Sequence, residues 1–143
     1  MTYTSDSEIS HIALSVLDKS LPKSEWTHAA HFAAALWMLA EPNRDAMAEM
    51  PDIIRAYNLA SGVENTDSDG YHETITLASI RAARAYLSAA EPGMALHETL
   101  NALLATRLGA SVWLLDYWSK PCLFSVRARR SWVDPDLAAF PFD

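Results

Sequence analysis

The chain has 143 residues, half of them hydrophobic and a fifth charged, which is typical of a single globular domain and excludes wholesale disorder. Eleven basic residues stand against eighteen acidic ones. The resulting formal net charge of -7 argues against nucleic acid as a partner, because nucleic-acid surfaces need clustered Lys and Arg. The single cysteine, Cys122, excludes an internal disulfide and a cysteine-based zinc site.

Helical periodicity runs along most of the chain, whereas no alternation of β-branched and aromatic residues predicts a strand. Apolar residues three and four apart predict a first helix over about residues 6–19. Ser5 and Glu8 have the spacing of a capping box at its start. A second helix is predicted over residues 27–41, and Pro42 ends it.

The third and fourth predicted helices cover about residues 43–61 and 71–90. Pro51 lies inside the third helix and predicts a kink or a break there, and Gly62 follows its end. A fifth helix is predicted over about residues 92–109, with its proline in the first turn. Shorter helices and a Pro-rich tail complete the chain, with the helices at residues 111–119 and 126–132.

These elements predict an all-α fold in one domain, residues 1–143: a compact, mainly up-down bundle of four to five long helices, followed by short C-terminal helices. Because the connections are short, the second and fourth helices should run parallel, with their N-termini at one end of the bundle. No apolar run of about 18 residues predicts a membrane span. The polar N-terminus lacks the features of a signal peptide, so we expect a cytoplasmic protein.

Histidines gather at the two helix starts that this topology brings together. His28 and His31 are three residues apart and share one side of the second helix, while His72 opens the fourth helix beside Glu73. Three imidazoles with an open position and a nearby carboxylate are typical of a catalytic metal site. We therefore expect the three histidines to lie within about 10 Å of one another and to bind zinc, nickel or iron. Glu73 would then be the general base.

Two alternatives to the metal site stay open. Without a metal, His28 or His72 is expected to be the acid–base group for a small polar molecule, with Trp26 beside the histidine pair as a wall of the pocket. Tyr57 and Asn58, at the end of the third helix, should reach the same place and contact that molecule. Each histidine alone also has a structural interpretation, because a histidine near a helix start often caps that helix.

Residues 65–70 begin like the calcium loop of an EF-hand, with oxygen-bearing side chains at the first, third and fifth places and Gly70 at the sixth. The twelfth place holds Thr76, where calcium binding needs a bidentate Glu. The better interpretation is a turn whose Asn and Asp side chains bond the backbone and cap the next helix.

Four strings together resemble an uncharacterised family of small bacterial proteins: W-T-H-x-x-H at 26–31, A-Y-N-x-A-x-G at 56–62, N-T-D-x-x-G-Y-H-E-T at 65–74 and L-F-S-x-x-A-R-x-x-W-V-x-P-D-L at 123–137. The resemblance covers most of the chain after Leu21 and implies no particular activity. It does imply that the three histidines and Glu73 belong to family motifs, as do Trp132 and three further ligand-binding candidates, Asn65, Asp67 and Arg129.

A weaker similarity, at the level of the fold, is to DinB-like four-helix bundles, which hold a metal with three histidines from different helices. This chain departs from them because two of its histidines, His28 and His31, come from one helix. That similarity is an analogy between folds and carries no sequence match.

The leading functional hypothesis is a metal-dependent hydrolase or a related enzyme with a His/Glu pocket at one end of the bundle. The second is a non-catalytic module that binds a small molecule or a metal. The third is an interaction or homo-oligomerising domain, in which the Trp-rich part from Trp113 to Phe142 forms an apolar surface. A deep pocket around the histidines favours the first two hypotheses, whereas a flat exposed patch of Trp118, Phe124 and Trp132 favours the third.

Overall fold

The computed structural model of the protein describes residues 2–143 and confirms the all-α prediction: that part of the chain contains seven α-helices, short 3-10 turns and no strand. The α-helices are α1 (Asp6–Leu17), α2 (His28–Ala40), α3 (Ala46–Ala60), α4 (Glu73–Ala89), α5 (Leu96–Leu104), α6 (Lys120–Leu123) and α7 (Val126–Arg130). The 3-10 turns are η1 (Lys23–Glu25), η2 (Arg107–Gly109) and η3 (Trp113–Asp116).

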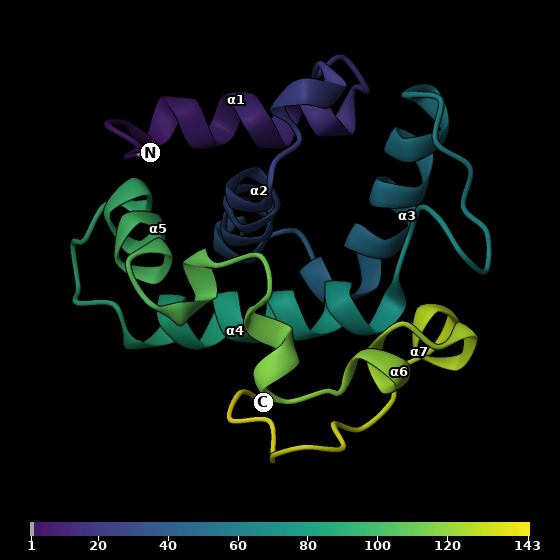
Figure 1. Ribbon diagram of the computed structural model, residues 1–143. Helices are drawn as coiled ribbons and strands as arrows, with labels where there is room; N and C mark the ends of the chain where they lie inside the picture. Colours follow the sequence, from purple (N-terminus) through teal and green to yellow (C-terminus); the bar gives the residue numbers. More distant parts are fainter. Residues whose placement is uncertain (1) are drawn as a thin grey trace.

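Helix α2 lies at the centre of the molecule. Figure 1 shows it end on between α1 and α4, and it packs against both of them and against α5. Seven of its thirteen residues are buried, and four of these are alanines, which let neighbouring helices approach closely. A helix that is apolar on all sides belongs in the interior, so the composition of α2 explains its place.

The course of α2 differs from the parallel arrangement that short connections predicted. It crosses α4 at a steep angle, because twelve residues, 61–72, join α3 to α4 and leave room for the chain to change direction. The starts of α2 and α4 nevertheless come close to one cavity, which His31 and His72 both line.

Local details of the helices also differ from the sequence predictions. Helix α3 continues through Pro51 without a break, and the kink expected there as the alternative stays a prediction. Ser5 caps α1 as predicted, accepting a hydrogen bond from Glu8 N, but the Glu8 carboxylate bonds Thr4 N rather than the backbone of the cap. The fifth helix begins only at Leu96 and ends at Leu104, and the segment predicted as a helix over 111–119 forms only the 3-10 turn η3.

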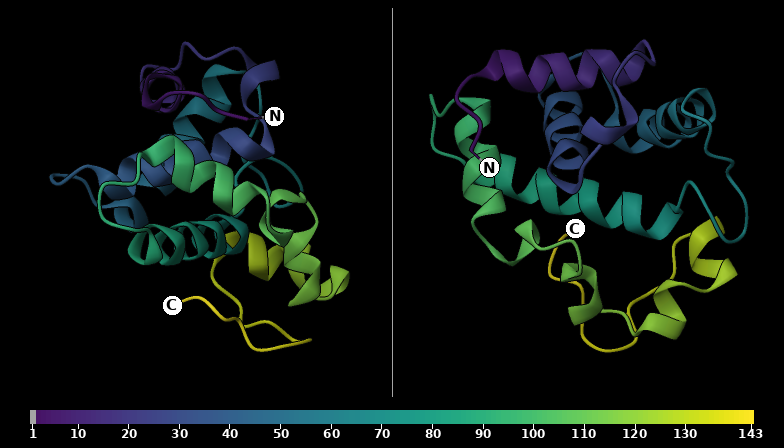
Figure 2. Two further views of the ribbon diagram at one scale, coloured as in Figure 1. Left: turned by 90° about the vertical axis from the view of Figure 1, so that its left-hand side faces the viewer. Right: turned by 45° about the horizontal axis from the view of Figure 1, so that its top comes forward.

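The C-terminal aromatic residues are used inside the molecule. Trp113 and Trp118 are 1% and 0% exposed, and the indole nitrogen of Trp118 donates to Val133 O at 3.0 Å. Phe140 and Phe142 pack their rings against Trp113. Figure 2 shows the segment that carries them running along the side of the molecule opposite α1. Of the three residues expected in a flat patch, only Phe124 is largely exposed.

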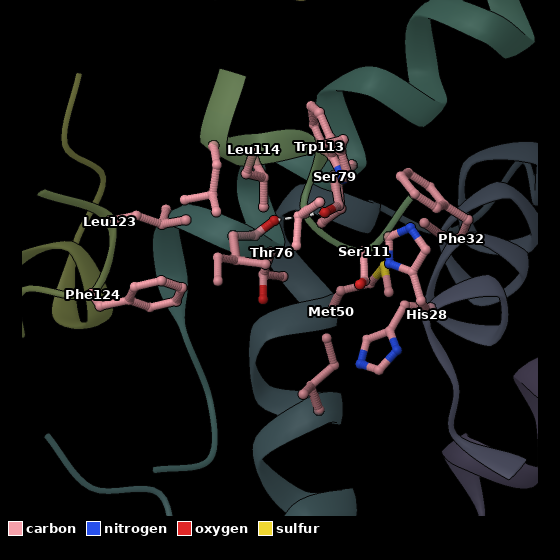
Figure 3. Close-up of a pocket in the computed structure, with 17 residues that line it drawn as sticks. His28, Phe32, Met50, Thr76, Ser79, Ser111, Trp113, Leu114, Leu123 and Phe124 are labelled. Carbon is pink, nitrogen blue, oxygen red and sulfur yellow. Dashed lines mark hydrogen bonds between the residues drawn. The ribbon is translucent and has the colours of Figure 1, made fainter. Parts of the chain in front are cut away.

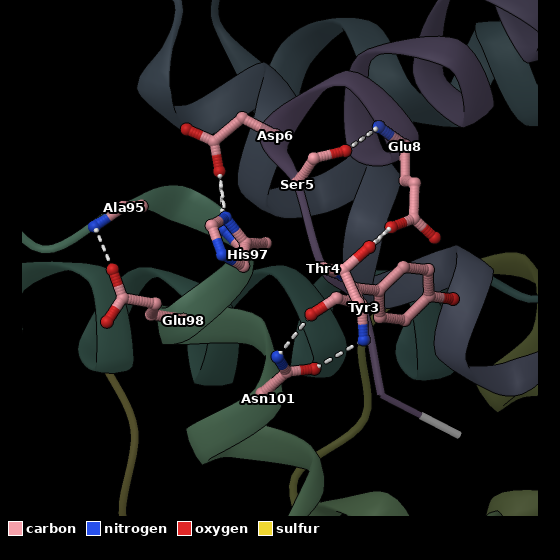
Figure 4. A network of polar contacts seen from close by, with 9 residues as sticks. All are labelled: Tyr3, Thr4, Ser5, Asp6, Glu8, Ala95, His97, Glu98 and Asn101. Atoms are coloured by element: carbon pink, nitrogen blue, oxygen red, sulfur yellow. Dashed lines mark hydrogen bonds and ion pairs between the residues drawn. The ribbon is translucent and has the colours of Figure 1, made fainter.

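The N-terminal segment is tied to α5 by side chains (Figure 4). Tyr3 and Asn101 exchange two backbone-to-amide hydrogen bonds of 2.9 and 2.8 Å. The Asp6 carboxylate accepts from both the backbone N and Nδ1 of His97. His97 is therefore a structural residue, and His11 is exposed on α1. Along residues 2–143, no helix combines the length and the apolar character needed to cross a bilayer.

We predict that enlarging Ala82, which is fully buried on α4, destabilises the protein. The substitution Ala82→Leu should lower the free energy of unfolding by about 1–3 kcal/mol, because the close-packed core has no room for three further carbons. Denaturant unfolding measures this, with the exposed Ala89→Leu of the same helix as the control. Equal stability of the two variants would contradict the tight packing of α4 in the core.

Candidate functional site

Two adjoining cavities lie beside the start of α2. The first cavity has a volume of about 280 Å³ and lies between α2, α3, α4 and the segment 111–124 (Figure 3). We call it the apolar cavity. The second, of about 340 Å³, lies under the loop between α3 and α4, and we call it the loop cavity. Four residues line both cavities and form the partition between them: His31, Ile54, Ile75 and Thr76.

The apolar cavity is built from one face of each of three helices. Its residues follow helical spacing, which places them on one side of each helix: His28, His31, Phe32 and Ala35 on α2; Met50 and Ile54 on α3; Ile75, Thr76, Ser79 and Ile80 on α4. Residues 111–115 and the pair Leu123 and Phe124 close the remaining side. The cavity therefore depends on the 3-10 turns of the C-terminal part as much as on the helices.

His28 is held in one orientation by the chain that follows α5. Its Nε2 donates to Leu108 O at 2.8 Å, and its ring meets the edge of Phe32 with centroids 5.3 Å apart. The carbonyl needs a donor, so in the neutral form of the ring the proton is on Nε2 and the lone pair is on Nδ1. His28 thus joins the start of α2 to η2 and at the same time lines the apolar cavity.

His31 has the opposite tautomer. Its Nδ1 donates to Thr27 O at 2.7 Å, which leaves the lone pair on Nε2. The ring stacks on Trp26 with centroids 3.8 Å apart and planes 30° apart. Burial lowers the pKa of His31 from 6.5 to about 4, so this imidazole is neutral near pH 7. The side chain is half-buried, and its accessible part faces the two cavities that it lines.

His72 has both ring nitrogens in use. Nδ1 accepts from Ile75 N at 3.1 Å and so caps α4, while Nε2 donates to Leu123 O at 2.7 Å and joins α4 to α6. Burial also lowers the pKa of His72. Binding a metal or moving a proton would cost one of these two hydrogen bonds, so in this arrangement His72 performs the structural role of a cap.

Glu73 faces a neighbouring side chain rather than either cavity. Its Oε1 accepts from the hydroxyl of Tyr71 at 2.5 Å, and burial together with this contact raises the pKa of Tyr71. Over residues 2–143, no three His, Cys, Asp or Glu side chains lie close enough together to hold a metal ion. The metal site and the role of Glu73 as its base therefore stay predictions.

The remaining candidate ligand-binding residues mostly hold the loop of residues 64–71 in place. Asn65 Oδ1 accepts from Asn58 Nδ2 and from Tyr71 N, both at 3.0 Å. Arg129 donates to Gly70 O and Tyr71 O at 3.1 and 3.2 Å. Of the residues in these contacts, Asn58, Gly70 and Tyr71 also line the loop cavity.

Further contacts complete the support of this loop and of Trp26. Asp67, in the EF-hand-like segment, accepts two hydrogen bonds from Arg130 of α7. The side-chain oxygens of Asn65 and Asp69 accept from the backbone N of Tyr71 and Gly70. Tyr57 donates to Leu21 O at 2.7 Å and packs against Trp26, which also lines the loop cavity. The segments 26–31, 56–62 and 65–74 thus each contribute residues to the wall of the loop cavity.

Sequence reasoning identified the histidines and Trp26 but missed most of the apolar lining. Trp113 and Phe124 come from short turns, which carry little periodic signal. The helical face that starts at His28 did carry a signal: His28, Phe32 and Ala35 have the spacing of a single stripe, on which histidine stands among apolar residues.

Comparisons with models of known protein families, with curated proteins and with solved structures found no match to this chain. The geometry and chemistry of the two cavities are therefore the basis for a function.

The lowered pKa of His31 predicts a stability change in acid. The unfolded chain takes up a proton near pH 6.5 but the folded chain only near pH 4, so this contribution to stability is complete above pH 6.5 and is lost as the pH falls to 4. Between these pH values the wild-type protein should lose up to about 3 kcal/mol more unfolding free energy than His31→Phe. Denaturant unfolding at a series of pH values measures the difference. His72 is present in both proteins, and its contribution cancels.

The metal prediction is tested with protein made without a histidine tag. If the three histidines bind zinc or another transition metal, His28→Ala, His31→Ala and His72→Ala should each weaken its uptake, whereas His11→Ala and His97→Ala should not. Metal content after dialysis measures this. Equal uptake by the wild type and by a triple variant lacking His28, His31 and His72 would refute a metal centre at this place.

Proposed function

We propose that this protein binds a small, mainly apolar molecule in the apolar cavity, with the histidine end of α2 as the polar part of the site. The observation that carries the proposal is the cavity's lining: twelve of its seventeen residues are apolar, and the polar ones are His28, His31, Thr76, Ser79 and Ser111. A concave apolar space with a few placed polar groups is the usual form of a small-molecule site.

The size of the cavity supports this proposal. A protein cavity of about 150 Å³ is enough to bind benzene, and the apolar cavity measures about 280 Å³. It can therefore hold a bicyclic ring or a chain of about eight carbons. The loop cavity beyond the partition offers further space for an end of the molecule that extends past His31.

Exposed apolar residues at the edge of the cavity also support a binding site for an apolar molecule. Val112 and Phe124 both line the apolar cavity, and they are 49% and 56% exposed, so they mark its mouth. A bound apolar molecule would cover part of these side chains, and removing apolar surface from water contributes about 25 cal/mol per Å².

The chemistry of His31 favours recognition over acid–base catalysis. A general base is most effective when its pKa lies near the working pH, whereas burial holds the pKa of His31 at about 4. Ser79 donates its hydroxyl proton to Ile75 O at 2.7 Å, and in the described residues no histidine stands behind it as a base. The arrangement thus supports the binding-module hypothesis more strongly than the hydrolase hypothesis.

The uncharged dye N-phenyl-1-naphthylamine provides the test, because its naphthalene ring is a bicyclic ring of the size that the apolar cavity holds and its phenyl ring has room in the loop cavity or at the mouth. We expect saturable binding of one dye per chain with increased fluorescence, and a rise in melting temperature with dye concentration, because a ligand that binds only the folded state stabilises it. Ser111→Trp should weaken binding at least 10-fold, since residue 111 is an exposed cavity residue where a large ring blocks the mouth.

The matched control is Ser88→Trp, an exposed position on α4 that lines neither cavity. This variant should bind the dye like the wild type. Dye binding that Ser111→Trp leaves unchanged would place the dye elsewhere on the protein and refute the proposal.

A further inference from the structure

We propose that the ligand of the apolar cavity is uncharged and carries one hydrogen-bond donor at its end, such as a hydroxyl, which donates to Nε2 of His31. This inference rests on the proposed function and adds the chemical class of the ligand and the residue that selects it. Three features of the described residues support it: a fixed acceptor, its access from the cavity, and the lack of charged groups in the lining.

The acceptor is fixed because the ring of His31 cannot turn freely. Nδ1 donates to Thr27 O at 2.7 Å, and Trp26 stacks on the ring at 3.8 Å. Trp26 itself packs against Tyr57, with ring centroids 5.5 Å apart, and Tyr57 is held by its hydrogen bond to Leu21 O. A hydrogen-bonding group that is oriented before the ligand arrives costs little entropy on binding.

A ligand in the cavities can reach Nε2 of His31, because this nitrogen is not a buried atom. Within residues 2–143, every buried side-chain nitrogen or oxygen has a hydrogen-bond partner, and Nε2 of His31 has none. Nε2 is therefore not one of the buried atoms, and His31 is half-buried and borders both cavities. Its lone pair is open to a molecule in these cavities.

The requirement for a donor follows from the tautomer. Since the only proton of the neutral ring is on Nδ1, Nε2 accepts hydrogen bonds and cannot donate them. A ligand that presents an ether or ketone oxygen at this place gains nothing from His31. A hydroxyl, phenol or amide N–H makes a hydrogen bond there.

The requirement for an uncharged ligand follows from the lining of the apolar cavity, which contains no Lys, Arg, Asp or Glu. The arginines around the loop cavity are already engaged. Arg55 lies over the ring of Tyr71 at 4.2 Å, Arg129 donates to backbone carbonyls, and Arg130 pairs with Asp67. A carboxylate or ammonium group would lose its hydration in the apolar cavity without gaining a counter-charge, which is costly.

The test uses two isomers of the same formula, 1-octanol and heptyl methyl ether, in competition with the dye. Both have the same number of heavy atoms, but only octanol donates a hydrogen bond. Wild-type protein should bind octanol about 3- to 10-fold more tightly than the ether, the difference expected from one hydrogen bond. Octanoate, which is charged at pH 7.5, should bind at least 10-fold more weakly than octanol.

Two variants assign the preference to His31. His31→Phe keeps a ring against Trp26 but removes the acceptor, and Thr27 O keeps its bond to the backbone N of residue 31. In this variant the two isomers should bind equally. His31→Gln, whose amide oxygen reaches about as far as Nε2, should restore a preference for octanol.

The outcomes separate the two proposals. Equal binding of the isomers by the wild type, an octanol preference that survives in His31→Phe, or tight octanoate binding would overturn the inference about the ligand while leaving the apolar cavity as a binding site. If neither isomer displaces the dye, or if Ser111→Trp leaves binding of both unchanged, the proposed function itself fails. The wild-type comparison decides the question even if His31→Phe does not fold.

Discussion

The burial of α2 is the constraint on which the other features of the structure depend. An alanine-rich helix that is surrounded by α1, α4 and α5 leaves no solvated face along most of its length. Its first turns are the exception, because they carry His28 and His31 into a region enclosed by α3, α4 and the C-terminal turns. Polar groups in such a place must find partners within the protein, since an unpaired buried polar group costs about 1–3 kcal/mol. The two cavities lie where these turns meet the surrounding elements.

The three histidines meet this demand in one common way. Each donates a ring N–H to a backbone carbonyl: His28 to Leu108, His31 to Thr27 and His72 to Leu123. Two of these bonds join elements far apart in the chain, across 80 and 51 residues. A neutral imidazole suits such places because one ring nitrogen donates a hydrogen bond to a carbonyl, while the other can accept a hydrogen bond from a second partner. The histidines that suggested a metal centre thus also act as connections between helices and turns.

How much was predictable differs between the fold and the site. The limits of α1, α2 and α4 follow from apolar spacing and from residues such as Pro42, so the all-α class could be predicted from local signals alone. The cavity could not, because one of its walls comes from the turns that carry Trp113 and Phe124, where no period repeats. The role of His72 was equally hidden. A sequence shows that a histidine stands at a helix start, but not which carbonyl its second nitrogen will meet.

The difference between His31 and His72 explains why one histidine can serve recognition while its neighbour serves structure. His72 uses both ring nitrogens in hydrogen bonds, one to the start of α4 and one to α6. The ring is therefore held in place, and neither nitrogen is available to a ligand. His31 uses only one, and Thr27 caps α2 in its place by accepting a hydrogen bond from Ala30 N. Serine, threonine, asparagine and aspartate cap helices well, so a helix with such a cap does not need a nearby histidine for that role. The capping choice at two helix starts thus decides which imidazole keeps an open nitrogen at the partition between the cavities.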